Sequence, residues 1–119
     1  MKDLAYFNKI YLALQPVDFR KQAYGLAVLV KQVMGCVPNE GRALFVFTNR
    51  RKTALKILYW DTTGFALWWK GLEKDHFRWP KNCSEAAQTI TASELKLLLQ
   101  GIDLAKIKKH APVDFSVTH

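Results

Sequence analysis

Short blocks of apolar residues, separated by polar turns, recur along the first two thirds of the chain. Blocks of this kind, rich in aromatic and aliphatic side chains, are typical of β-strands. They occupy residues 9–14, 43–47, 54–60 and 65–69. The sequence "HFRWP" predicts one more short strand at 76–80, ended by Pro80.

The connectors between the central blocks are short and turn-like. They read "TNRRKT" at 48–53 and "DTTG" at 61–64. Short connectors join neighbouring strands as antiparallel hairpins. The centre of the chain is therefore predicted to be a β-meander of three or four strands.

A different spacing follows the first strand and predicts a long helix. Pro16 ends the strand, and Asp18 is a suitable N-cap for a helix from Phe19 to about Met34, with Gly35 as its C-terminal stop. The apolar residues of this segment recur at helical spacing, so one face is expected to pack against the sheet.

The segment "TITASELKLLLQGID", residues 89–103, predicts a second helix. Thr91 and Glu94 have the spacing of a capping box. Gly101 is a suitable residue just after the helix end, and Ile102 can close a Schellman-type contact. The apolar face is formed by Leu95, Leu98 and Leu99.

These elements predict an α+β fold, in which an antiparallel β-meander packs against one long helix and a second, C-terminal helix lies at an end or edge. The length of 119 residues fits one domain. We expect a single domain over 1–119, with its core at about 9–105 and a basic tail at 106–119.

The charge of the chain changes the interpretation of the central meander. The net charge is +8, and residues 42–81 alone contain nine Lys or Arg and three acidic residues. An uneven basic excess indicates a polyanionic partner such as nucleic acid, an anionic membrane or an acidic protein face. Basic proteins without a nucleic-acid partner are also common, so the charge alone does not decide.

No recognisable catalytic pattern accompanies this charge. The acidic residues and the three histidines are scattered, and no P-loop, HExxH or G-x-S-x-G motif is present. We expect no catalytic residue, no metal site and no cofactor. Cys36 and Cys83 are expected to be free thiols. Without a signal peptide or an apolar segment long enough to span a bilayer, the protein is expected to be cytoplasmic, with no membrane contact.

The candidate DNA-binding residues are cations near the predicted turns and strand ends. They are Arg20, Lys21, Arg42, Arg50, Arg51, Lys52 and Lys56. Three consecutive cations at 50–52 repel one another and add nothing to a hairpin, whereas a basic hairpin tip can lie along a phosphate backbone. The alternatives are a solvated turn, or charges that protect a sheet edge from aggregation. The adjacent Trp68 and Trp69 must point to opposite faces, so one of them can be exposed.

Four stretches, in this order, resemble the TnpB accessory (Orf2-like) proteins of the IS66 family of insertion sequences. They read "VDFRK", "YGLAVLV", "LFVFTNRRKTALKILYWDTTGFALWWKGLEKDHFRWP" and "ITASELKLLLQGID". The resemblance covers about residues 10–105. It implies a protein encoded beside a larger transposase, which assists transposition without supplying the DDE-type active site.

The sequence therefore predicts a non-catalytic accessory protein of DNA transposition. It is expected to bind the phosphate backbone of the element DNA, the transposase or other proteins of the same element, or both. Two alternatives remain: a protein-interaction adaptor for the transposase that never touches DNA, and a small metal-dependent nuclease. Metal-dependent cleavage of a plasmid distinguishes the second from the others.

Overall fold

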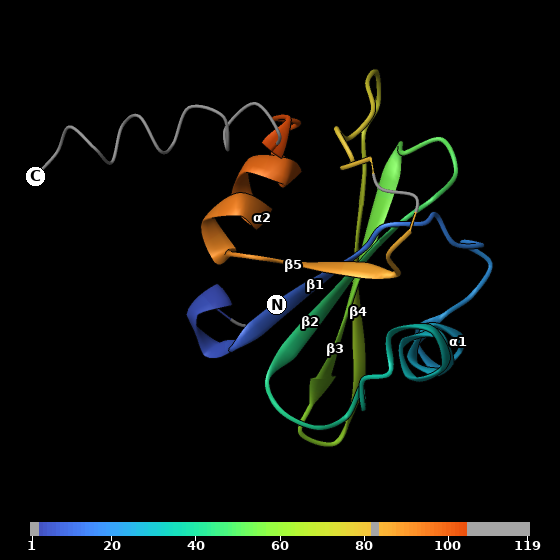
Figure 1. The fold of residues 1–119 in the computed structure, drawn as a ribbon, viewed down its shortest axis with the longest axis vertical. Helices are drawn as coiled ribbons and strands as arrows, with labels where there is room; N and C mark the ends of the chain where they lie inside the picture. The colour runs from blue at the N-terminus through green and yellow to red at the C-terminus, as the bar shows by residue number, and fades with distance from the viewer. Residues whose placement is uncertain (1–2, 82–83, 105–119) are drawn as a thin grey trace, which may run out of the picture.

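A computed structural model describes residues 3–81 and 84–104 of the chain (Figure 1). The short 3₁₀ turn Leu4–Tyr6 precedes the first strand. The strands and helices are β1 (Lys9–Ala13), α1 (Ala23–Leu29), β2 (Ala43–Thr48), β3 (Ala54–Asp61), β4 (Gly64–Gly71), β5 (Ala87–Ile90) and α2 (Ala92–Leu99). The predicted basic tail at 106–119 lies outside the described residues.

One five-stranded sheet organises the molecule, in the order β4-β3-β2-β1-β5. The pairs β2–β3 and β3–β4 are antiparallel, which confirms the predicted meander. β1 is parallel to β2, however, and antiparallel to β5. The sheet is therefore mixed rather than purely antiparallel, because the chain returns through α1 between β1 and β2, as a parallel pair requires.

Both faces of the sheet are covered, so the fold has three layers (Figure 1). On one face, Leu26, Ala27 and Val30 pack against residues of β2 and β3. On the other face, Leu95 and Leu98 of α2 join a second core cluster. Side chains alternate across each strand, so the two clusters draw on alternate residues of the same strands. α2 thus helps to cover the second face together with Phe7, Phe77 and Trp79, and its expected place at an end or edge of the sheet stays a prediction.

The helix at the first cluster is shorter than predicted. α1 begins at Ala23, after an N-cap Gln22 whose side chain makes no capping bond, and it continues as one π-helical segment from Val30 to Met34. Gly35 ends it with a φ of 68°, as predicted. Asp18 is not the N-cap. Its backbone carbonyl instead accepts a hydrogen bond from the N–H of Lys21 at 3.0 Å, which closes a separate turn before the helix.

The prediction of a strand at 76–80 is also wrong, and a strand at 87–90 was missed. Phe77 and Trp79 are buried in the second core cluster, but the backbone around them forms no ladder. β5 pairs with β1 at the other edge of the sheet. Its sequence, "AQTI", has too few apolar residues to stand out as a strand.

The second helix agrees closely with its prediction. The Thr91 hydroxyl accepts from the N–H of Glu94 at 3.1 Å, while the Glu94 carboxylate accepts from the N–H of Thr91 at 2.9 Å. At the other end, the N–H of Ile102 donates to the carbonyl of Leu97 at 3.0 Å, which is the Schellman bond. The described part of the chain contains no helix with the length and apolar character needed to cross a membrane.

Candidate nucleic-acid interface

The turn between β2 and β3 is held rigid by Asn49. Its side-chain oxygen accepts from the N–H of Thr53 at 2.9 Å, and its side-chain nitrogen donates to the Thr53 hydroxyl at 3.0 Å. The N–H of Lys52 donates to the backbone carbonyl of Asn49 at 3.0 Å and closes the turn. Arg50 and Arg51 take the two positions between them and are exposed. An ordered backbone therefore presents two adjacent guanidinium groups to solvent.

Lys52 adopts a backbone conformation that favours glycine. Its φ is 59°, in the left-handed region, where a side chain costs roughly 1–2 kcal/mol. Its carbonyl accepts a hydrogen bond from the N–H of Phe77 at 2.7 Å, which docks the segment after β4 onto the turn. A residue that keeps a long cationic side chain at such a position is a candidate for function.

The segment after β4 adds cations that the candidate set did not include. Phe77 and Trp79 point inward, and the indole N–H of Trp79 donates to the carbonyl of Ala13 at 2.8 Å. The residues between and after them, Arg78 and Lys81, are exposed. The alternation of apolar and polar residues at 76–79 could have shown that Arg78 is exposed. It was interpreted as the pattern of a strand instead.

Together the turn and this segment form a cleft of about 520 Å³. Its cationic lining residues are Arg51, Lys52, Arg78 and Lys81, and Asp103 also lines it. Asp75 partly offsets the charge, since its carboxylate lies 3.8 Å from the Arg78 guanidinium and 3.3 Å from the His76 ring. No carboxylate of the described residues lies within ion-pairing distance of Arg51 or Lys52.

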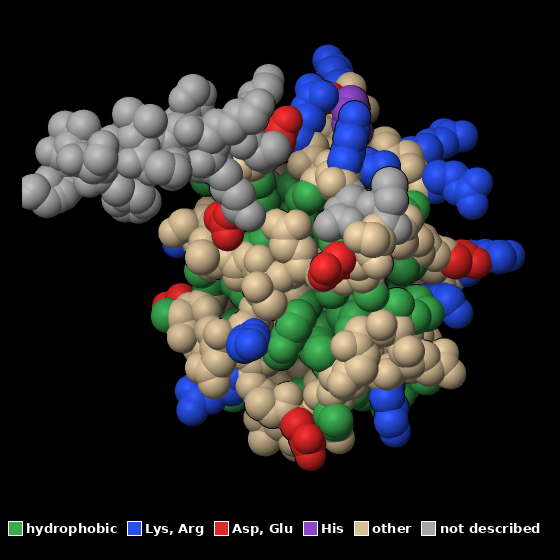
Figure 2. All heavy atoms as spheres, viewed as in Figure 1, with side chains coloured by type: hydrophobic (Ala, Val, Ile, Leu, Met, Phe, Trp, Pro, Cys, Tyr) green, Lys and Arg blue, Asp and Glu red, His purple; other side chains and the backbone are tan. Residues whose placement is uncertain are grey.

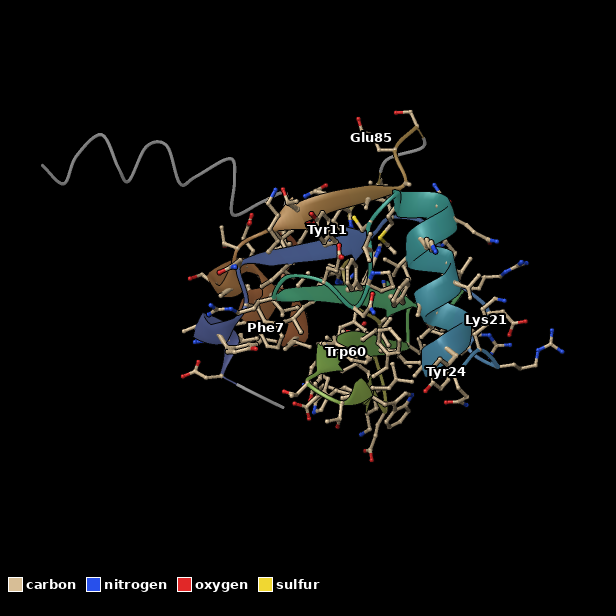
Figure 3. The ribbon with its side chains drawn as sticks, turned by 90° about the horizontal axis from the view of Figure 1, so that it is seen from below. Phe7, Tyr11, Lys21, Tyr24, Trp60 and Glu85 are labelled. Carbon is tan, nitrogen blue, oxygen red and sulfur yellow. The ribbon has the colours of Figure 1, made fainter. Side chains whose placement is uncertain are left out.

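Arg20 and Lys21 lie on the α1 side of the same turn. Arg20 lines a second cleft with Arg50. Its guanidinium is fixed by Asp18 through hydrogen bonds of 2.7–3.1 Å. These bonds, more than the backbone N–H bond from Arg20, lower the pKa of Asp18 to about 2, and Asp18 raises the pKa of Arg20 in turn. In Figure 3, Lys21 lies on the outer side near α1, away from the sheet.

The structure gives Lys56 a different role from the one predicted. Its side chain is buried, with 6% exposed, and its ammonium donates to the backbone carbonyls of Phe19 and Lys21, each at 2.9 Å. Burial lowers the pKa of Lys56, while the charge of Asp18 acts in the opposite direction. An ammonium committed to two carbonyls is not available to a phosphate, so we remove Lys56 from the candidate contacts.

Arg42 is also separate from the turn. It precedes β2, whereas Arg50 follows the other end of that strand, so the length of the strand lies between them. The Arg42 guanidinium stacks over the ring of Tyr6, 5.1 Å from its centroid. Arg42 therefore does not form a continuous basic surface with the turn.

The other five candidate cations lie with Arg78 and Lys81 at one end of the sheet, which we call the basic end. It consists of Arg20, Lys21, Arg50, Arg51, Lys52, Arg78 and Lys81. Figure 2 shows Lys and Arg side chains projecting from the upper part of the molecule, where the β2–β3 turn and the segment after β4 lie in Figure 1. Within residues 3–81 and 84–104, no group of three or more His, Cys, Asp or Glu side chains is placed to hold a metal ion.

Fold and site together define a small three-layer α+β domain with a positively charged end. The chain belongs to the IS66 Orf2-like family: the family's sequence model, described as "IS66 Orf2 like protein", matches residues 8–109. This match confirms the resemblance seen in the sequence. It associates the chain with IS66-type insertion sequences and with an accessory role in transposition.

Two relatives from Sinorhizobium fredii (strain NBRC 101917 / NGR234) are similar over most of their length. The uncharacterized protein y4jC is 36% identical over 101 residues, which cover 85% of this chain and 85% of the relative. The uncharacterized protein y4hO is 34% identical over 95 residues, covering 80% of this chain and 81% of that protein. No solved structure matches the chain.

Proposed function

We propose that this protein is a non-catalytic accessory factor of transposition that binds the phosphate backbone of the element DNA through its basic end. The observation that carries the proposal is the convergence of cations from three separate segments at one end of a rigid sheet. These segments are the turn before α1, the β2–β3 turn and the segment after β4. Such an arrangement brings no benefit to the fold, because like charges repel.

The chemistry of the basic end fits phosphates better than bases. Arg50 and Arg51 are exposed on a fixed turn, so their guanidinium groups can form paired hydrogen bonds to phosphate oxygens. Lysine and arginine contacts of this kind position a protein on a duplex without reading its sequence. We therefore expect binding that depends steeply on salt and weakly on sequence.

The decisive experiment measures duplex binding against salt concentration. The test variant neutralises the turn as Arg50→Gln, Arg51→Gln and Lys52→Gln. The matched control removes the same charge from exposed cations elsewhere, as Lys9→Gln, Lys31→Gln and Lys96→Gln. If each turn residue contacts one phosphate, the salt slope of the test variant falls by about 2.7. The control variant keeps the wild-type slope, and the melting temperatures of both stay close to that of the wild type.

Two outcomes contradict the proposal in distinguishable ways. If the wild type captures the element's transposase in a pull-down, but shifts no duplex at low salt, the protein is an adaptor. Equal slopes for the test and control variants mean that the turn is only solvated. Incubation with plasmid and Mg²⁺ or Mn²⁺ tests the nuclease alternative, since nicking by the wild type overturns the non-catalytic role.

A further inference from the structure

Strand β4 forms one edge of the sheet and lacks the usual protection of an edge strand. The sheet order leaves no strand outside it, and Figure 3 shows the strands in succession with β4 at the lower edge. Natural edge strands are commonly protected by charges, proline or bulges. β4, "GFALWWKG", has no proline and one charged residue, Lys70. The Lys70 ammonium turns inward and donates to the carbonyl of Leu99 at 3.1 Å.

The hydrogen-bond phase shows which backbone groups face outward. Opposed residues in an antiparallel ladder alternate between bonded and non-bonded pairs. The N–H of Leu72 donates to the carbonyl of Thr53 at 2.8 Å, just beyond the ladder, and this bond sets the phase. The residues whose N–H and C=O groups point away from β3 are therefore Phe65, Leu67 and Trp69, with Gly71 at the strand end. Among the described residues, no other segment donates to or accepts from the backbone of β4.

The same three residues share the α1 face of the sheet. Phe65 and Leu67 are half-buried at the margin of the α1 core cluster, and Trp69 is 60% exposed. The indole of Trp69 lies over Gly71, where an added Cβ would meet its ring at 2.6 Å. The three residues with outward-facing backbone groups thus also carry apolar side chains that the rest of the chain covers incompletely.

We propose that β4 pairs with β4 of a second copy of this chain, antiparallel, about a two-fold axis at Leu67. In this register Phe65 of each copy lies opposite Trp69 of the other, which forms two cross-strand aromatic pairs. On the opposite face, Ala66 lies opposite Trp68 of the second copy, so a small side chain meets a large one. The three outward-facing residues then form bonded pairs across the axis.

The side-chain sizes along β4 favour a second copy as the occupant, and the charge distribution permits it. Two chains with a net charge of +8 repel, so they can join only where few cations meet. The pairing surface of β4 carries only Lys70, which is turned inward. Gly71 lies at the basic end, and the two-fold axis reverses the strand direction in the second copy. The two basic ends therefore lie at opposite ends of the joined sheet.

A neighbouring register is less favourable. An axis at Trp68 places the two Trp68 side chains opposite each other, and it sets Phe65 against Gly71 of the second copy. The space over Gly71 is already filled by the indole of Trp69. The size pattern along β4 therefore favours the axis at Leu67 over the axis at Trp68.

The dimer does not depend on the proposed DNA binding, so the first test is made without DNA. Analytical ultracentrifugation of the wild-type chain is expected to show a monomer–dimer equilibrium at concentrations up to about 0.1 mM. Trp69→Lys is expected to raise the dissociation constant about tenfold or more, because it removes both aromatic pairs and adds charge at the edge. The matched control Val37→Lys changes an exposed apolar residue away from β4 and is expected to leave the constant unchanged.

Disulfide cross-linking tests the register. In a background with Cys36→Ser and Cys83→Ser, Leu67→Cys is expected to form a covalent dimer, because bonded antiparallel pairs place their Cα atoms about 5.5 Å apart, within disulfide range. Ala66→Cys lies opposite Trp68 of the second copy rather than its own counterpart, so it is expected to form no covalent dimer under oxidation. A wild type that stays monomeric up to about 0.1 mM overturns the proposal. So does a dimer that Trp69→Lys leaves intact and Leu67→Cys fails to cross-link.

Discussion

The ammonium nitrogen of Lys56 lies 2.9 Å from the carbonyl oxygen of Phe19 and 4.8 Å from the centroid of the Phe19 ring. A third contact, to the carbonyl of Lys21, completes its surroundings. One side chain from β3 therefore fixes the turn that carries Arg20 and Lys21. Because this turn lies before the helix, its carbonyls lack the hydrogen-bond donors that a helix would supply. The Lys56 ammonium is their donor instead.

Replacing Lys56 with methionine tests this role. Lys56→Met keeps most of the apolar stem but leaves the carbonyls of Phe19 and Lys21 without their donor. We expect a loss of about 1–3 kcal/mol in the free energy of unfolding, measured by chemical denaturation. Amide hydrogen exchange at 18–21 is expected to speed up. Lys70→Met removes a single bond to Leu99 and serves as the matched control, with unchanged exchange at 18–21.

Because the pKa of Lys56 is lowered, the same variant is also expected to change how the free energy of unfolding depends on pH. The folded chain releases this proton at a lower pH than the unfolded chain, whose reference pKa is 10.5. Between the lowered pKa and 10.5, the unfolded state holds more protons, so the free energy of unfolding rises with pH. We expect Lys56→Met to lack this alkaline rise. Equal pH profiles for the wild type and the variant contradict the assignment.

The variant Lys52→Gly tests the contribution of the Lys52 side chain to DNA binding separately from its effect on stability. Lys52→Gly relieves the left-handed backbone conformation but gives the unfolded chain more freedom, so stability is expected to stay within about 1 kcal/mol of the wild type. Duplex binding is expected to weaken, with the salt slope reduced by about 0.9. Thr62→Gly makes the same backbone change at a φ of 56° in the β3–β4 turn and should leave the slope unchanged. An unchanged slope in Lys52→Gly removes Lys52 from the interface.

The elements that the sequence predicted best are those set by local chemistry. The apolar blocks of β2, β3 and β4 are joined by short polar turns, and each signal acts over a few residues. The caps of α2 at Thr91 and Gly101 likewise depend on neighbours in the chain. The parallel pairing of β1 and the short strand β5 depend on distant partners, which no local pattern records.

The candidate site divides in the same way. The sequence predicted the turn that holds Arg50, Arg51 and Lys52, because a turn dense in cations is a local feature, while their contact with DNA stays a prediction. Lys56 was misassigned, since its partners lie more than thirty positions away in the chain. Arg78 was missed because Phe77 bonds to the turn through its backbone, a contact that leaves no pattern in the sequence.

Trp79 is expected to anchor the cationic segment after β4. Trp79→Phe keeps the ring in the core but removes the N–H that bonds to Ala13, at a cost of about 1–3 kcal/mol. Because Arg78 and Lys81 flank the anchor, duplex affinity should also fall. Trp60→Phe provides the control, since Trp60 lies at the opposite end of β3 from the basic end, where its ring packs edge-on against Phe65. Wild-type melting and binding in Trp79→Phe would show that the apolar ring alone holds the segment.

The pKa of the Asp18 carboxyl measures its contact with Arg20. An NMR titration is expected to give Asp18 a pKa of about 2, against an ordinary value of 3.8, because the Arg20 guanidinium and N–H bond to its charged form. Since the folded pKa is depressed, the stabilising contribution is complete above 3.8 and is lost as the pH falls toward 2. Arg20→Gln is expected to return the pKa toward 3.8.

The ion pair also limits what Arg20 can contribute to a phosphate contact. Asp18→Asn keeps a polar acceptor for the N–H of Arg20 but removes the negative charge beside its guanidinium. We expect this variant to bind duplex DNA more tightly than the wild type at low salt, with the difference shrinking as salt screens the charge. Asp61→Asn removes the same charge at the β3–β4 turn, at the opposite end of β3 from the basic end, and serves as the control. If both variants gain affinity equally, net charge alone explains the gain and Arg20 makes no specific contact.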